Sequence, residues 1–229
     1  MMQEFGDISQ NQKGVLRVGT GFTRGRILIP RILPVFGKLF PNICVELWEG
    51  NNDVLTRQLQ EGDIDLAIAG FTDNPPGVVL EDFYREEVVL VMTRSLAQKM
   101  QLTDQLFPES GFSILKDVPF ILGREDDIGG RVGAKLFRKA GISRPVVRAI
   151  SDNLETRLAL VLRDIGACFC PRNLMEGTLS AGDAASLLVV PTGPEGENMI
   201  HFGYVKKNYQ WSVIEAFIRC AREPGAVRR

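Results

Sequence analysis

At 229 residues, with 45% hydrophobic and 24% charged side chains, the chain has the composition of a globular protein and exceeds the usual ~100–150 residues of one compact domain. Lysine and arginine number 27 against 28 for aspartate and glutamate, so a net charge of -1 leaves no basic surface to grip a nucleic-acid backbone. No run approaches the ~20 apolar residues of a membrane span, and the first residues, which include Glu4 and Asp7, do not resemble a secretory signal. We therefore expect a cytoplasmic chain without a membrane partner that does not bind DNA by itself.

The four cysteines and the single histidine do not form a pattern typical of metal or catalytic sites. Cys44, Cys168, Cys170 and Cys220 lack the CxxC spacing of zinc sites. Cys168 and Cys170 would lie on one side of a strand, where they form either a redox or metal-binding pair or, as we favour, two small apolar side chains in a buried strand. His201 has no Cys or Asp close by in sequence. We expect no metal and no cofactor.

Strand and helix patterns alternate through the first part of the chain, which favours a largely parallel sheet covered by helices. Four strands are expected, at 15–19, 43–48, 64–69 and 87–92. A helix is expected over 27–40, with its start uncertain because of Pro30 and Pro34. A second helix begins after Asn51 or Asn52, either of which can cap it, and ends at Gly62.

The alternation continues after an irregular stretch at 93–113 that contains a weak helix. The expected strands are 120–122, 146–150, 167–170, 187–190 and 199–205, and the expected helices are 131–140, a short one near Leu174, and 211–222, which should pack back onto the first lobe. Another helix opens at Asp152, with Glu155 completing a variant of the capping box. Its buried stripe is predicted to consist of Leu154, Leu158, Val161, Leu162 and Ile165.

Four segments in series resemble the effector-binding domain of LysR-type transcriptional regulators. They are Gly14-Val15-Leu16-Arg17-Val18-Gly19; Ile29-Pro30 with Leu33-Pro34-Val35-Phe36 and Phe40-Pro41; Glu61-Gly62-Asp63-Ile64-Asp65-Leu66-Ala67-Ile68; and Glu86-Glu87-Val88-Val89-Leu90-Val91. Their order and spacing match the family as well as their content, and the later strand-helix alternation extends the resemblance to about residue 222.

The resemblance implies an α/β fold of two Rossmann-like lobes joined by two crossover segments, the type 2 periplasmic-binding-protein-like architecture. We expect the crossovers near Met92–Thr93 and Thr192–Glu197, so that 14–92 plus 193–229 form lobe I and 93–192 form lobe II. Family members normally begin with a winged helix-turn-helix and a linker helix. Residues 1–13 are therefore expected to be a linker remnant or a tag, and DNA binding to require that missing N-terminal domain. The resemblance further implies a homodimer, and a tetramer in the full-length protein.

In such folds a ligand binds in the inter-lobe cleft, outside the carboxyl ends of the strands. In lobe I this rule selects Thr20, Phe22, Thr23, Arg24, Gly70, Phe71 and Thr72. In lobe II it selects Arg124, Ile128, Gly129, Arg131, Ser151 and Phe169, with Asp152 and Pro171 as further candidates.

The resemblance suggests roles for several of these residues. Thr23 occupies the position where relatives offer a hydroxyl to the effector, and the alternative is that it only caps its helix. Relatives often carry a threonine where this chain has Gly70, so Phe71 or Thr72 would have to substitute. Arginines at 24, 124 and 131 could grip a carboxylate by a bidentate fork, or could simply be solvated at the surface. We expect a small effector, an anionic organic acid.

Two other functions compete with the regulator domain. A solute-binding protein of a transporter would share the two-lobed architecture but normally requires export, which the acidic N-terminus argues against. An enzyme would need chemistry that the sequence lacks, because we find no GxGxxG after a strand, no P-loop, no GxSxG elbow and no histidine suited to a triad. We therefore expect no catalytic activity.

Overall fold

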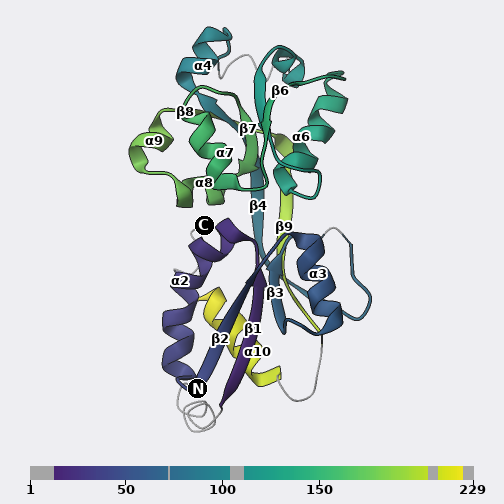
Figure 1. Cartoon of the computed structure of the whole chain (residues 1–229), viewed down its shortest axis with the longest axis vertical. Coiled ribbons are helices and arrows are strands. Elements are labelled where there is room, and N and C mark those ends of the chain that lie inside the picture. Colours follow the sequence, from purple (N-terminus) through teal and green to yellow (C-terminus); the bar gives the residue numbers. More distant parts are fainter. Residues whose placement is uncertain (1–12, 72, 104–110, 206–210, 224–229) are drawn as a thin grey trace. The chain divides into compact units, whose positions relative to one another are not determined.

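The computed structural model of the protein describes residues 13–71, 73–103, 111–205 and 211–223 (Figure 1). The chain forms two compact units, unit 1 comprising Met1–Tyr84 with Met199–Arg229 and unit 2 comprising Arg85–Asn198. The first division lies earlier than the crossover expected near residues 92–93, because β4 (Val79–Thr93) is one long strand whose second half already pairs with strands of unit 2. The second division lies just after the expected segment 192–197.

Unit 1 is built on a sheet in the order β2-β1-β3-β9. The strands β1 (Gly14–Thr20), β2 (Ile43–Glu49) and β3 (Leu66–Ala69) are mutually parallel, whereas β9 (Glu197–Tyr204) runs antiparallel to β3. The expectation of a largely parallel sheet therefore holds for the first three strands only. A strand that lies parallel to its neighbour is usually reached through a crossover helix. The chain enters β9 directly from unit 2 without such a helix, and β9 is antiparallel to β3.

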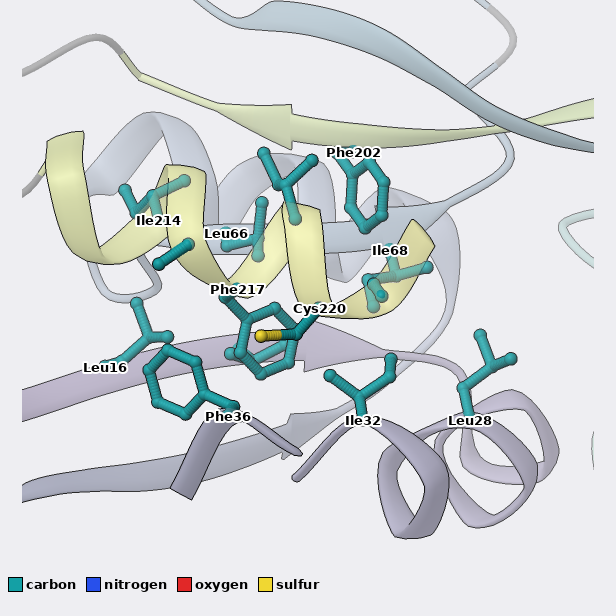
Figure 2. Packing of buried hydrophobic residues seen from close by; sticks show 14 of the residues in the cluster. Leu16, Leu28, Ile32, Phe36, Leu66, Ile68, Phe202, Ile214, Phe217 and Cys220 are labelled. Carbon is teal, nitrogen blue, oxygen red and sulfur yellow. The ribbon is translucent and has the colours of Figure 1, made fainter. Parts of the chain in front are cut away.

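Two helices cover one face of this sheet and a third covers the other (Figure 1). The alternation in β3 explains this, because Leu66 and Ile68 pack with α2 (Phe22–Leu39) and α10 (Trp211–Arg222), whereas Ala67 and Ala69 pack with α3 (Asn52–Glu61). In Figure 2 the rings of Phe36 and Phe217 meet, 5.2 Å apart and edge to face. The prediction that the last helix packs onto the first lobe is confirmed.

The two helices of the first half agree with the sequence to different degrees. α3 is capped as expected, since Asn51 Oδ1 accepts a hydrogen bond from the Val54 amide at 2.9 Å and Gly62 ends the helix with φ 82°. α2 begins at Phe22 and not near residue 27, and both prolines lie inside it on its exposed side. Its first turn escaped prediction because Thr23, Arg24 and Gly25 carry no apolar signal; a Cβ at Gly25 would lie 2.7 Å from Thr20 Cγ2.

Unit 2 combines antiparallel and parallel strand pairs. The second half of β4 pairs antiparallel with β7 (Cys168–Pro171) and β8 (Leu187–Pro191), while β5 (Pro119–Leu122) pairs parallel with β6 (Val146–Ile150). A parallel bridge between Phe120 and Ala167 links these two groups. The helical segments are α4 (Arg94–Lys99), η1 (Gly111–Leu115), α6 (Ile128–Lys139), α7 (Leu154–Val161), α8 (Arg172–Thr178), α9 (Ala181–Ala185) and η2 (Gly193–Gly196).

Helix α7 differs from the sequence prediction at its start and at its end. Its N-cap is Asn153, whose Oδ1 accepts a hydrogen bond from the Thr156 amide at 2.9 Å, and not Asp152. Ile165 is 42% exposed and lies beyond the end of the helix, so it is not part of the buried stripe. Among the described helices, none is both long and apolar enough to cross a lipid bilayer.

The turn after α7 is tied to α4 through one carboxylate. Asp164, in the left-handed region with φ 58°, accepts hydrogen bonds from the Thr93 hydroxyl, from Ser95 Oγ at 2.7 Å and from Lys99 Nζ at 2.9 Å. These hydrogen bonds, led by that from Thr93, lower the pKa of Asp164 from 3.8 to about 2. The ionised carboxylate therefore stabilises this corner of unit 2.

This lowered pKa makes stability depend on pH. Asp164 contributes stability in full above a pH of about 4 and loses it as the pH falls towards about 2. We expect Asp164→Asn, which tolerates the left-handed backbone, to cost on the order of 1 kcal/mol near neutral pH and to flatten the stability profile below about pH 4. Urea unfolding at several pH values measures this, with Asp117→Asn at the exposed, 3.9 Å Lys116 pair as the control. If the free energy of unfolding changed equally with pH in wild type and in Asp164→Asn below about pH 4, the lowered pKa assigned to Asp164 would be contradicted.

Candidate functional site

The turn between β1 and α2 presents several of the candidates in unit 1. Thr20 is buried at the end of β1, and its Oγ1 donates to the Ile68 carbonyl at 3.3 Å, so this hydroxyl serves the sheet. Phe22 is 59% exposed at the start of α2. The N-cap of α2 is Gly21, with no side-chain cap, so no side chain of the cap residue occupies the start of this helix.

Thr23 and Arg24 lie within the first turn of α2, and both are 7% exposed. Because the N-cap is Gly21, the alternative that Thr23 caps the helix is wrong. Arg24 is not a solvated surface cation either, since its Nε donates to the Tyr84 hydroxyl at 3.2 Å. Of the two, Thr23 is therefore the better candidate for contact with a ligand.

The end of β3 carries the remaining candidates of unit 1. Gly70 is buried, and Thr72 lies outside the described residues. Phe71 packs on β9, since its ring meets that of His201 edge to face at 6.3 Å and a Cβ at Gly203 would lie 2.5 Å from Phe71 Cζ. The side chain of Phe71 is thus packed against β9 within unit 1.

His201 is a feature that the sequence did not single out as a site residue. Its Nε2 lies 3.4 Å from Asp82 Oδ1, and its Nδ1 is buried without a hydrogen-bond partner in the part of the chain that the structure describes. Both neighbours, Asp82 and Phe71, come from distant segments. No local pattern could have revealed this environment.

In unit 2 the candidates gather around the start of α6. The helix begins at Ile128, earlier than the expected residue 131, and its N-cap is Asp127. Asp127 Oδ2 accepts from the Gly130 amide at 3.1 Å and from Arg157 Nη1 at 2.8 Å. The earlier start places Ile128, Gly129 and Arg131 in the first turn.

Two glycines allow this turn to lie against its neighbours. A Cβ at Gly129 would overlap the Phe169 carbonyl oxygen, and a Cβ at Gly130 would overlap the Arg124 carbonyl oxygen. Any larger residue at either position would push α6 away from β7 or from the preceding loop. The start of α6 is therefore held in a fixed position within unit 2.

The arginines of this region differ in what they contact. Arg124 Nε donates to Asp152 Oδ1 at 2.6 Å, and both side chains are 68% exposed. In contrast, Arg131 Nη2 is buried and has no hydrogen-bond partner among the described residues. A buried donor left unsatisfied costs roughly 1–3 kcal/mol, so this group would gain from a bound acceptor.

The other candidates of unit 2 have mainly structural surroundings. Phe169, a candidate for contact with the ligand, is 1% exposed, and its ring stacks on Phe120 in the core. Ser151 Oγ accepts from the Asn153 amide at 3.3 Å, ahead of α7. Ile128 packs partly against the core, and Pro171 is buried at the start of α8.

Arg157 on α7 was missed by the sequence analysis although it is 1% exposed. Burial alone would lower its pKa, but the charge of Asp127 and the hydrogen bond to it outweigh burial and raise the pKa above its ordinary value. Arg157 therefore remains a cation inside unit 2. It escaped notice because its partner lies on another element, 30 residues away.

The two cysteines of β7 behave as ordinary core thiols. Cys168 and Cys170 are both fully buried on β7, and the pKa of Cys170 is raised by its hydrogen bond with Cys168 and by burial, which keeps the thiol protonated. This agrees with the apolar interpretation of the pair. Within the described segments, no three His, Cys, Asp or Glu side chains come together as metal ligands would.

Comparison with known proteins shows a family to which the chain is similar. The model of the LysR substrate binding domain matches residues 9–225. A RuBisCO operon transcriptional regulator of Acidithiobacillus ferrooxidans is 34% identical over 188 residues, which are 81% of this chain and 57% of the regulator. A protein of Anaeromyxobacter dehalogenans named phosphonates import ATP-binding protein PhnC is 35% identical over 180 residues, 77% of this chain and 34% of that protein.

The fold is shared with a solved regulatory domain. The effector binding domain of QuiR in complex with shikimate superposes with a TM-score of 0.70 at 19% identity, covering 92% of this chain and 96% of that one. This chain spans 30% to 57% of the length of the first four curated relatives. From the family match over residues 9–225, the chain belongs to the LysR substrate-binding domain family.

Proposed function

We propose that this chain is the sensing part of a LysR-type transcriptional regulator and that its effector is a small organic acid. LysR regulators bind small-molecule effectors and DNA, and this family of domains is regulatory and not enzymatic. The proposal extends the family assignment to a ligand class. Its main support is a buried side-chain donor without a partner in the first turn of α6.

The observation that best supports an anionic ligand is made at the start of α6. Its first turn holds Arg131, whose Nη2 is buried and unpartnered, at the end of the helix where the backbone dipole favours negative charge. A carboxylate accepts hydrogen bonds and carries the opposite charge, so it satisfies both conditions at once. A neutral sugar would satisfy only the first.

In unit 1 the proposed contact is Thr23. Its side chain lies in the first turn of α2, whose N-cap offers no side-chain oxygen to the backbone amides of that turn. A ligand oxygen at this turn could accept from the Thr23 hydroxyl. Phe71 would contribute apolar contact for an effector with an organic frame.

The proposal also covers the whole regulator. DNA binding would reside in a winged helix-turn-helix outside this chain, and a regulator that acts on DNA would be cytoplasmic. We further propose a homodimer of these domains, with a tetramer in the full-length protein. Helix α2 supports pairing better than α6, because Leu33 and Leu39 are exposed on α2, whereas Val132, Leu136 and Phe137 of α6 are buried in the core of unit 2.

The solute-binding alternative is not favoured. The matching family is that of transcriptional regulators, and the relative named for phosphonate import shares only 34% of its length with this chain. Its name describes an ATP-binding protein, and this sequence has no phosphate-binding loop of the form GxxxxGK[ST]. That name therefore gives no reason to assign transport here.

The ligand class can be tested through Arg131. We expect carboxylates such as benzoate, but not neutral sugars or amines, to raise the melting temperature of the domain, by the equivalent of ~2.7 kcal/mol at a hundredfold excess over Kd. Arg131→Gln should weaken carboxylate binding tenfold or more, because it removes a charged hydrogen bond. Arg138→Gln, an exposed position on the same helix, is the matched control. A response confined to sugars or amines would show the proposal of an anion to be wrong.

The role of Thr23 can be separated from its packing by two substitutions. Thr23→Val keeps the shape but removes the hydroxyl, and we expect it to bind the carboxylate roughly tenfold more weakly. Thr23→Ser keeps the hydroxyl and should bind nearly as wild type. Calorimetric titration well below the melting temperatures measures both variants. If Thr23→Val bound the carboxylate with unchanged affinity, Thr23 would not be a ligand contact, and the proposed role of Arg131 would be unaffected.

The proposed homodimer can be tested by charge at the exposed face of α2. Leu33 and Leu39 are 36% and 42% exposed, so Leu33→Glu with Leu39→Glu should fold but lose any dimer that buries them. Sedimentation velocity at tens of micromolar compares the variant with wild type. Glutamates at the exposed positions Lys135 and Arg138 of α6 serve as the control. A wild-type monomer, or a dimer unaffected by the α2 substitutions, would contradict this surface.

A further inference from the structure

The start of α6 contains an electrostatic conflict. Asp127 places a carboxylate at the N-cap, where it accepts from the Gly130 amide at 3.1 Å. That charge would repel an anion at the same helix end, in the turn that contains Arg131. An anionic effector therefore needs the charge of Asp127 to be cancelled.

Arg157 has the geometry to cancel it. Its guanidinium, 1% exposed, donates from Nη1 to Asp127 Oδ2 at 2.8 Å, the same oxygen that caps α6. A Cβ at Gly123 would overlap both Arg157 Nη1 and Asp127 Oδ2, so the loop after β5 lies directly against the pair. Arg157 Nε has no hydrogen-bond partner among the described residues. A second donor thus lies unsatisfied at this helix start.

We propose that Arg157 is a positioning residue that makes the start of α6 receptive to an anion, by neutralising Asp127 and fixing it as the cap. This inference rests on the proposed function, because it assumes that the ligand is anionic and is bound by Arg131. Arg157 acts through Asp127 and does not touch the ligand. With this pair neutral, Arg131 supplies a positive charge in the first turn of α6, and the sign of the preferred ligand depends in part on a buried residue on a different helix.

A purely structural pair would behave differently from a pair that tunes ligand charge. If the pair only holds α6 to α7, removing either partner should lower stability and leave anion affinity unchanged or reduced in both variants. If it sets the local charge, the two single substitutions should move affinity in opposite directions. Asp127→Asn keeps an oxygen to cap α6 and leaves Arg157 charged, whereas Arg157→Met leaves the Asp127 carboxylate uncompensated.

The experiment titrates the isotope-labelled protein with inorganic sulfate and follows the Gly129 and Gly130 amides by NMR. We expect sulfate affinity to rise about tenfold in Asp127→Asn and to fall about tenfold in Arg157→Met, as one unit charge at close range produces. The double variant, neutral like the wild-type pair, should return to within about threefold of wild type. Lys139→Met removes a cation from the other end of this 12-residue helix, roughly 16 Å away, and should change little.

The outcomes separate this inference from the proposed function. If Arg157→Met does not fold, Asp127→Asn carries the test alone, and Arg157→Lys should bind sulfate as wild type does. Sulfate binding that is lost in Arg131→Gln but is equal in wild type, Asp127→Asn and Arg157→Met would overturn the role of Arg157 and leave the anion site standing. Absence of sulfate binding at the α6 amides in wild type would overturn both.

Discussion

The candidate site of unit 2 depends on how closely α6 approaches β7 and the loop before it. That approach is a steric constraint, since Gly129 and Gly130 have no room for a Cβ against the carbonyls of Phe169 and Arg124. Because the backbone is held there, the first turn of the helix, its cap at Asp127 and the side chain of Arg131 have fixed positions relative to one another within this unit. A helix with bulkier residues at these positions would stand further from β7 and from the preceding loop.

Electrostatics then decides which arginine can serve a ligand. Arg24 donates to the hydroxyl of Tyr84, and Arg124 forms an exposed ion pair with Asp152. Arg157 forms a buried ion pair with Asp127 through Nη1. Arg131 retains a buried donor with no partner in the described segments. Exposed pairs such as Arg124–Asp152 contribute little to stability, so the interior pair and the unsatisfied donor dominate the chemistry of this region.

Much of the fold could be predicted from local sequence. The cap at Asn51, the stop at Gly62 and the apolar period of 211–222 are short-range signals, and the structure agrees with each. The first turn of α2 could not be predicted in this way, because Thr23, Arg24 and Gly25 carry no apolar signal and Gly25 lies close against Thr20. The choice between Asp152 and Asn153 as a cap also needed the structure, since Arg124 engages the former.

The site was predictable as a set of loops but not as a set of contacts. The rule that ligands bind at the carboxyl ends of strands selected Arg131 and Gly129, and it also selected Phe169, whose ring belongs to the core. Arg157 and His201 were not selected, because each owes its environment to partners far away in the chain. Sequence periodicity reports which side of an element is buried, not which atoms remain without a partner there.

The account is tested most directly by a crystal structure of this domain grown without sulfate or phosphate and soaked with a carboxylate that stabilises it. We expect a carboxylate oxygen within hydrogen-bond distance of Arg131 Nη2, at roughly 2.7–2.9 Å, with Asp127 still paired to Arg157. A ligand bound elsewhere, with Arg131 Nη2 still unpartnered, would contradict the claim that this arginine and the start of α6 recognise the effector.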